Sequence, residues 1–214
     1  MQLISVNVGQ EQQLQTAKST RNTGIYKLPS PGPVQVTSAG LAADVICDVK
    51  NHGGPDQAVY VYGAPDYAWW SETLGQEILP GAFGENLTIS ELESTRFSIG
   101  DRLHIGNLIL EVTAPRIPCS TLAARMGDPA FVKRFRQAER PGLYCRVIRE
   151  GWVAAGDPVT YARYPGQTIS VLAMFRDFYD PLMAEAAIRR HLAAPIAVRA
   201  RVEREEQLRK LLQK

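Results

Sequence analysis

The stretch RLHIGNLILEVT, residues 102–113, contains the clearest fold signal in the chain. Apolar runs flank Gly106-Asn107, and both of these residues tolerate the positive φ angles that a two-residue hairpin turn requires. The stretch therefore predicts two antiparallel strands, at residues 102–105 and 108–113.

Other short apolar stretches, separated by Gly, Pro, Asn and Asp, predict further strands at residues 2–8, 25–28, 34–37, 57–62, 86–90, 143–149 and 158–162. Two helices interrupt them. The first begins at Pro65 and stops at Gly75, and the second begins at Asp128-Pro129 and stops at Pro141-Gly142. Because strands and helices do not alternate regularly, a mainly antiparallel barrel or sandwich is favoured over a parallel sheet.

The pattern changes after Tyr164-Pro165-Gly166, where three helices and no convincing strand are predicted. We therefore expect two domains, a mainly β domain at residues 1–165 and a small three-helix domain at residues 166–214. So small a module buries little surface, so we expect it to dock on the first domain or on another subunit.

The 214-residue composition is that of an ordinary soluble globular protein. No signal peptide or membrane-spanning stretch is evident, which predicts a cytoplasmic protein without membrane contact. The three cysteines form no CxxC pair and no zinc-finger spacing, so structural zinc and a resident iron–sulfur cluster are not expected.

Charge is unevenly distributed along the chain. Residues 1–100 hold five basic and ten acidic residues, whereas residues 116–149 hold eight basic and two acidic ones. The basic region is either a solvated helix face or a site for an anion such as phosphate. The three-helix segment has a basic excess of only three and no recognition-helix pattern, so nucleic-acid binding is not expected.

The stretch PRIPCST, residues 115–121, places Cys119 after two prolines that stiffen the chain where a strand ends. Arg116 would favour the thiolate form of Cys119. From these residues alone Cys119 is an inert cysteine, a metal ligand or a nucleophile. Cys47 and Cys145 are predicted to be core residues.

A nucleophilic cysteine needs a histidine base. His104 lies in a predicted strand and His191 in the helical tail, which leaves His52 as the candidate. His52 belongs to the loop KNHGGPDQ, residues 50–57, whose polar side chains and tandem glycines suit either a ligand-binding loop or a simple turn. The tripeptide at residues 84–86 allows the same two interpretations.

Taken together, these pieces resemble the MOSC family, the domain related to the C-terminal part of molybdenum cofactor sulfurases, and in particular its YiiM-like branch. The matching segments are TGIYK (23–27), GPV (32–34), GLAAD (40–44), HGGPDQAVYVY (52–62), FGENLT (83–88), IGD (99–101) and PRIPC (115–119). The three-helix tail also looks like that of this branch. Ala43 departs from an expected acidic residue or glycine, and Ala200 from an expected polar helix cap.

The resemblance implies a β-barrel of the MOSC type with a few peripheral helices, and it implies binding of molybdenum cofactor, also called molybdopterin. By similarity Cys119 would be the protein thiolate on molybdenum, which fits a soft-ligand site. His52, Arg116 and Lys27 would contact the pterin or its phosphate, and Asn86 would shape the pocket. Lys50 is added as a phosphate ligand on charge alone.

The implied function is reduction of N-hydroxylated compounds such as N-hydroxylated nucleobases, which would make the protein a detoxifying oxidoreductase. Cys119 and His52 would be its catalytic residues. A separate flavin or iron–sulfur reductase must supply electrons, since the sequence holds no dinucleotide fingerprint. A homodimer through the terminal amphipathic helix is expected. The alternatives are a non-catalytic cofactor-binding or sulfur-carrier module and a metal-free Cys119/His52 hydrolase.

Overall fold

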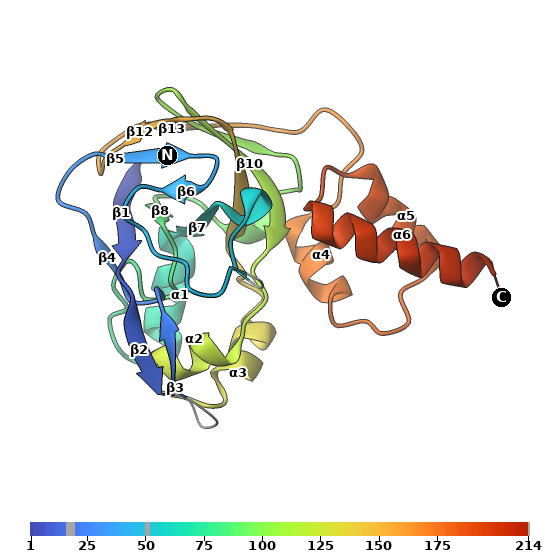
Figure 1. The fold of residues 1–214 in the computed structure, drawn as a ribbon, viewed down its shortest axis with the longest axis horizontal. Coiled ribbons are helices and arrows are strands. Elements are labelled where there is room, and N and C mark those ends of the chain that lie inside the picture. The colour runs from blue at the N-terminus through green and yellow to red at the C-terminus, as the bar shows by residue number, and fades with distance from the viewer. Residues whose placement is uncertain (16–19, 50–51, 214) are drawn as a thin grey trace.

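The computed structural model describes residues 1–15, 20–49 and 52–213 (Figure 1). In this part of the chain the strands are β1 (Leu3–Gly9), β2 (Gln12–Gln15), β3 (Thr20–Thr23), β4 (Lys27–Pro29), β5 (Val34–Thr37), β6 (Gly40–Leu41), β7 (Val59–Gly63), β8 (Leu87–Ile89), β9 (Arg102–Ile105), β10 (Leu108–Pro115), β11 (Leu143–Arg149), β12 (Gly151–Val153) and β13 (Val159–Ala162). The helices are α1 (Ala64–Leu74), α2 (Ser120–Arg125), α3 (Phe131–Ala138), α4 (Val171–Asp177), α5 (Glu185–Ala193) and α6 (Val198–Leu212), with 3-10 turns η1 (Pro55–Gln57) and η2 (Ser94–Arg96).

The principal sheet has eight strands in the order β13-β9-β10-β11-β7-β8-β1-β4. Its neighbouring pairs are antiparallel except β7 with β8, which run parallel. A parallel pair needs a crossover connection, and α1 lies in the segment that joins these two strands. The sheet-rich, mainly antiparallel character predicted from the sequence is therefore confirmed.

The predicted closed barrel is not supported. Within the described residues, β13 and β4 are the two edges of the sheet and do not pair with each other. The reason is that β1 pairs with β8 through residues 3–6 and with β4 through residues 7–9. Only the beginning of β1 therefore lies near β13. There a single isolated bridge forms between Gln2 and Pro158.

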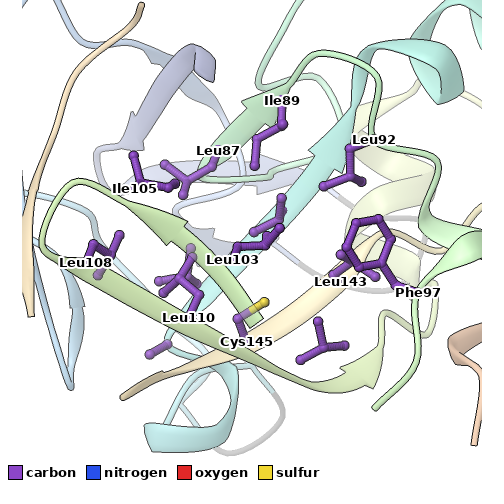
Figure 2. Packing of buried hydrophobic residues seen from close by; sticks show 14 of the residues in the cluster. Leu87, Ile89, Leu92, Phe97, Leu103, Ile105, Leu108, Leu110, Leu143 and Cys145 are labelled. Atoms are coloured by element: carbon purple, nitrogen blue, oxygen red, sulfur yellow. The ribbon is translucent and has the colours of Figure 1, made fainter. Parts of the chain in front are cut away.

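Side chains of the β9–β10 hairpin form part of the main hydrophobic core (Figure 2). Leu108 pairs with Ile105, and Gly106 takes a φ of 55° in the turn, as the sequence predicts. Cys145 on β11 packs in this core without exposure, and burial raises the pKa of its thiol, so it is the inert core cysteine that was expected.

Helices α1 and α3 cover a second, aromatic cluster. Helix α1 ends at Gly75, which has a φ of 66°, as predicted. Trp70 of α1 lies 5.0 Å from the ring of Phe131 on α3. Helix α3 begins two residues later than Pro129 because the carboxylate and carbonyl of Asp128 accept the backbone N–H groups of the next residues in a turn.

The three predicted tail helices are present (Figure 1). Helix α4 packs on β10 and η2, and its Val171 and Met174 belong to the main core. Helices α5 and α6 pack against each other over a small cluster around Ile188. The tail thus docks on the sheet through α4 and through the segment between α5 and α6, whose Ala194 and Ile196 belong to the same core, while α6 contributes no fully buried side chain. Whether residues 1–165 and 166–214 are separate domains stays a prediction.

No helix in the described segments has the length and apolar character needed to cross a membrane.

Candidate functional site

A cavity opens where the end of β10 and the start of α2 meet the segment before β4 and the loop before β7. The space inside it that water can reach is about 110 Å³. Five of the six predicted site residues line this cavity: Lys27, His52, Asn86, Arg116 and Cys119. The sixth, Lys50, lies outside the described residues. We call this space the Cys119 cavity.

Cys119 occupies the position directly before α2, where Pro118 ends the extended segment after β10. Its Sγ atom lies 3.6 Å from Nε2 of His52. On the other side of the imidazole, Nδ1 lies 3.4 Å from the hydroxyl of Tyr144 on β11. The three side chains therefore form a continuous row from strand β11 to the start of α2.

The environment of Cys119 favours its ionised form. Burial by itself raises the pKa of this thiol, but four influences act in the opposite direction: the hydrogen bond with His52, the charges of Arg116 and His52, and a hydrogen bond with the backbone of Leu122. Together they lower the pKa from 9.0 to about 6. Cys119 is therefore mainly a thiolate at neutral pH, the form that binds soft metals or attacks electrophiles.

Arg116 is the buried cation of the site, with an exposure of 4%. Its Nη1 donates a hydrogen bond of 2.8 Å to the carbonyl of Phe83, and its guanidinium lies 5.1 Å from the ring centre of Tyr60. Its Nε is buried without a hydrogen-bond partner in the described structure. A buried N–H of this kind calls for an acceptor, which a bound anion would supply.

Lys27 also lines the cavity, but its charge is balanced inside the protein. Its ammonium pairs with Asp44, and both side chains are almost fully buried. Burial lowers the pKa of Lys27, although Asp44 opposes the effect. The carboxylate of Asp44 also accepts hydrogen bonds from the backbone of Gly9 at 2.7 Å and from Nδ2 of Asn86 at 2.8 Å.

Asn86 links segments that line the cavity through its side-chain hydrogen bonds. While Nδ2 donates to Asp44, Oδ1 accepts from the backbone N–H of Tyr60 at 3.1 Å, which joins the start of β8 to β7. Gly84, two residues earlier, has a φ of 75°, and a Cβ there would lie 2.8 Å from the side chain of Ile25. The segment at residues 84–86 is thus a tight turn that also contributes to the cavity.

The loop that carries His52 is connected to the tail. Asp56 forms an ion pair with Arg146 at 3.0 Å, and its Oδ2 accepts the backbone N–H of Val198 at 2.6 Å. The residue before α6 is Ala197, which has no capping side chain, so Asp56 caps this helix from a distant loop. This explains the missing polar cap expected near Ala200, which itself lies inside α6.

Three features of the site differ from the sequence-based expectations or were missed by them. Cys47 is half-buried and lines the cavity instead of lying in the core, because the segment before the 52–57 loop runs along the cavity and not under the sheet. Ala43 has a φ of 64°, a conformation that favours glycine, so the backbone explains the expected glycine but not the alanine present. Tyr144 and Arg21 also line the cavity. The alternation in LYCRVI places Tyr144 on the face opposite Cys145, which is a weak signal for it, whereas the sequence held no signal for Arg21.

Comparisons with known proteins agree with this arrangement. Residues 48–160 match the MOSC domain model. YflK of Bacillus subtilis is 35% identical over 191 residues, 89% of this chain and 86% of YflK. A protein of Gibberella moniliformis named "Reductase" is 33% identical over 158 residues, which are 72% of this chain but 28% of that longer protein. The crystal structure of YiiM from Geobacillus stearothermophilus matches with a TM-score of 0.79 and 27% identity, covering 97% of this chain and 98% of that one.

The chain therefore belongs to the MOSC domain family. Within that family it is a member of the YiiM-like branch, as its sequence motifs predict.

Proposed function

We propose that the protein is a molybdenum-cofactor-dependent reductase of small N-hydroxylated compounds, with N-hydroxylated nucleobases among its substrates. The observation that carries this proposal is the Cys119 thiol, which lines an open cavity with its pKa lowered to about 6. Membership of the MOSC family supports the cofactor, and the name of the Gibberella moniliformis relative supports a reductase.

The donor set fits a metal that brings most of its own ligands. Across the described residues, no group of three or more His, Cys, Asp and Glu side chains could hold a metal ion. A pterin dithiolene supplies sulfur ligands itself and needs only one protein thiolate, which Cys119 provides. The unpartnered Nε of Arg116 fits an anionic cofactor in the same cavity.

Cys119 would hold the metal, and Arg116, His52, Asn86 and Lys27 would surround the pterin. When bound, the cofactor supplies the two electrons that cleave the N–O bond of the substrate. The overall balance is an N-hydroxyl group plus two electrons and two protons, giving an amine and water.

His52 would supply a proton. Burial raises the pKa of Tyr144, so this phenol keeps its hydrogen and can donate it to Nδ1 of His52. Nε2 of the same imidazole faces Cys119 and carries a proton there when it donates the hydrogen bond that favours the thiolate. From that position it can protonate the leaving oxygen directly or through a water molecule.

Electrons must return from a separate flavin or iron–sulfur reductase. Helix α3 offers one candidate docking surface, because Lys133, Arg134 and Arg136 give it a basic side. Helix α6 exposes Val198, Val202 and Leu212, which suits a homodimer contact. Both partners are part of the proposal.

Two alternatives use the same thiolate. A cofactor-binding or sulfur-carrier module needs Cys119 but no turnover, and a metal-free hydrolase would use the contact of 3.6 Å between Cys119 and His52 as a nucleophile–base pair.

To test the proposal, the parent protein, Cys119→Ser and Cys47→Ser are purified from cells that make molybdenum cofactor. Cys47 is the matched control because it also lines the cavity, whereas the hydrogen bond of His52 to a described cysteine is with Cys119. We expect molybdenum, pterin and conversion of 6-N-hydroxylaminopurine to adenine, with reduced methyl viologen as donor, in the parent and in Cys47→Ser. We expect conversion to be lost in Cys119→Ser.

A parent protein that contains molybdenum and pterin but converts no N-hydroxylated compound supports the binding module instead. A parent protein that contains neither molybdenum nor pterin contradicts both the reductase and the binding module. The metal-free hydrolase is then the remaining candidate.

A further inference from the structure

Three segments that lie far apart in the chain meet at Asp56, four residues after His52. They are the 3-10 turn η1, the neighbouring strands β10 and β11, and the segment between α5 and α6. Oδ1 of Asp56 pairs with Arg146 of β11 at 3.0 Å, and Oδ2 accepts the backbone N–H of Val198 at 2.6 Å. One carboxylate therefore joins the loop that carries His52 to both the sheet and the tail.

Arg146 holds the tail from the side of the sheet. Its Nη2 donates hydrogen bonds to the backbone carbonyls of Pro195 and Ile196, at 3.2 and 3.0 Å. A second carboxylate, that of Glu111, lies 3.9 Å from Arg146, farther away than Asp56. The guanidinium thus connects Asp56 with the segment that leads into α6.

Thr113 of β10 contacts the backbone of the same segments. Its hydroxyl lies 2.5 Å from the backbone carbonyl of Asp56 and 3.1 Å from that of Tyr144, and its own carbonyl accepts the N–H of Ala197 at 3.3 Å. The side chain of Thr113 is fully buried. We call Asp56, Thr113 and Arg146 the tail clamp.

The chain between His52 and the tail clamp offers few side chains for packing. Gly53 and Gly54 have φ angles of 105° and 82°, and a Cβ at Gly54 would meet no atom within 4 Å. Pro55 then begins η1 with a fixed φ, and the N–H of Gln57 donates to the carbonyl of Gly54 at 3.0 Å. The place of His52 therefore depends on where η1 is anchored.

We infer that the tail clamp positions the imidazole of His52 against the Cys119 thiol, which makes the three-helix tail a working part of the site. Asp56 and Arg146 are positioning residues: neither belongs to the described lining of the cavity, so they act through the loop. When the clamp is broken, η1 is free to shift, and the contact of 3.6 Å between Nε2 of His52 and Sγ of Cys119 is lost.

The test measures the rate of iodoacetamide alkylation at neutral pH in the cofactor-free full-length protein, with peptide mass spectrometry to separate the cysteines. The variants are Asp56→Ala and Arg146→Gln, and the control is Arg201→Gln. Arg201 of α6 donates to the carbonyls of Leu192 at 2.9 Å and Ala194 at 2.7 Å. Its replacement loosens the same junction between α5 and α6 but leaves Asp56 in place.

The parent and Arg201→Gln should be alkylated at Cys119 at the same rate. In Asp56→Ala the rate should fall several-fold, because the thiol loses the hydrogen bond with His52 that favours the reactive thiolate. Arg146→Gln should reduce the rate by a smaller factor, since Asp56 still accepts the N–H at the start of α6.

Cys145 separates repositioning from loss of stability. It is fully buried and reacts only when the chain unfolds. An Asp56→Ala protein in which Cys119 reacts as fast as in the parent overturns the inference, and so does an Arg201→Gln protein slowed to the same degree. If rapid alkylation of Cys145 shows that Asp56→Ala is unfolded, the same comparison is made with Arg146→Gln.

The ring signals of His52 in NMR spectra of the same proteins are a second readout. They should shift in Asp56→Ala and keep their parent positions in Arg201→Gln, whereas the signals of His104 on β9 should stay unchanged in both. Unshifted His52 signals in Asp56→Ala would contradict the inference. Because neither measurement involves the cofactor, the outcome is independent of the proposed reductase activity.

Discussion

Nε2 of His52 lies 3.6 Å from Sγ of Cys119, although the two residues are 67 positions apart in the chain. His52 comes from the loop before β7, and Cys119 follows the end of β10. The strand between them in the sheet, β11, supplies Tyr144 to the other side of the imidazole. The ionisation of the thiol therefore depends on how three separate segments pack together.

Alkylation of Cys119 should follow the titration of its thiolate. In cofactor-free protein we expect the iodoacetamide rate at Cys119 to rise with a midpoint near pH 6, the lowered pKa of this thiol. His52→Ala should move the midpoint up toward 9.0 because it removes the hydrogen bond that favours the thiolate. Peptide mass spectrometry separates the sites, and Cys47, whose pKa burial raises, should react slowly at neutral pH. A parent midpoint near 9.0 would contradict this account.

Asp44→Asn should strongly destabilise the fold. It leaves the buried Lys27 ammonium without its partner, which costs about 3–5 kcal/mol in the free energy of unfolding. Urea unfolding measures the change. Lys27→Met combined with Asp44→Asn should recover much of the loss because no unpaired charge remains, and failure to recover it would argue against a charge-based cause.

Asp56→Ala should loosen the start of α6. The variant removes the acceptor of the Val198 N–H, and loss of a helix cap costs about 1 kcal/mol. Hydrogen exchange should accelerate in the first turn of α6 and in the 52–57 loop. The control is Asp128→Ala, which removes an acceptor at the start of α3 and should affect α3 alone. Unchanged protection at Val198 would refute the connection between loop and tail.

His191 should make the tail sensitive to acid. Its side chain is fully buried, and Nε2 lies 2.8 Å from Asp177. Burial lowers its pKa from 6.5, helped by the charges of Arg204 and Arg190 and opposed by Asp177. The unfolded state therefore binds a proton more readily than the folded state, so stability is complete above pH 6.5 and falls as the pH drops below it.

Thermal unfolding at about pH 5 and about pH 8 measures this effect. His191→Gln should show a smaller difference between the two conditions than the parent, whereas His104→Gln on β9 should behave like the parent. An equal pH dependence in the parent and in His191→Gln would contradict the assignment.

The parts of the fold that local signals determine could be predicted from the sequence. Gly106-Asn107 sets the β9–β10 hairpin by turn geometry, and Gly75 ends α1 by adopting a positive φ. Helix α2 was missed because it has six residues and begins after Cys119 without a capping signal. Strands β2 and β3 are polar and pair only with each other, so they lack the apolar alternation that marks a strand.

The details of the site depend on long-range packing. The motif residues His52, Arg116 and Cys119 could be selected from the sequence, but the neutralisation of Lys27 by Asp44 could not, because it requires β4 to lie beside the segment after β6. Tyr144 reaches His52 only because β11 pairs with β7. The open edges of the sheet likewise follow from the way β1 divides its pairing between β8 and β4.

The central claim is that Cys119 is the protein ligand of a molybdenum cofactor, and X-ray absorption at the molybdenum edge tests it most directly. Parent protein from cofactor-producing cells should contain molybdenum with one more sulfur ligand than molybdenum in Cys119→Ser, or Cys119→Ser should lose the metal altogether. An equal metal content with an identical sulfur shell in the two proteins would contradict the claim.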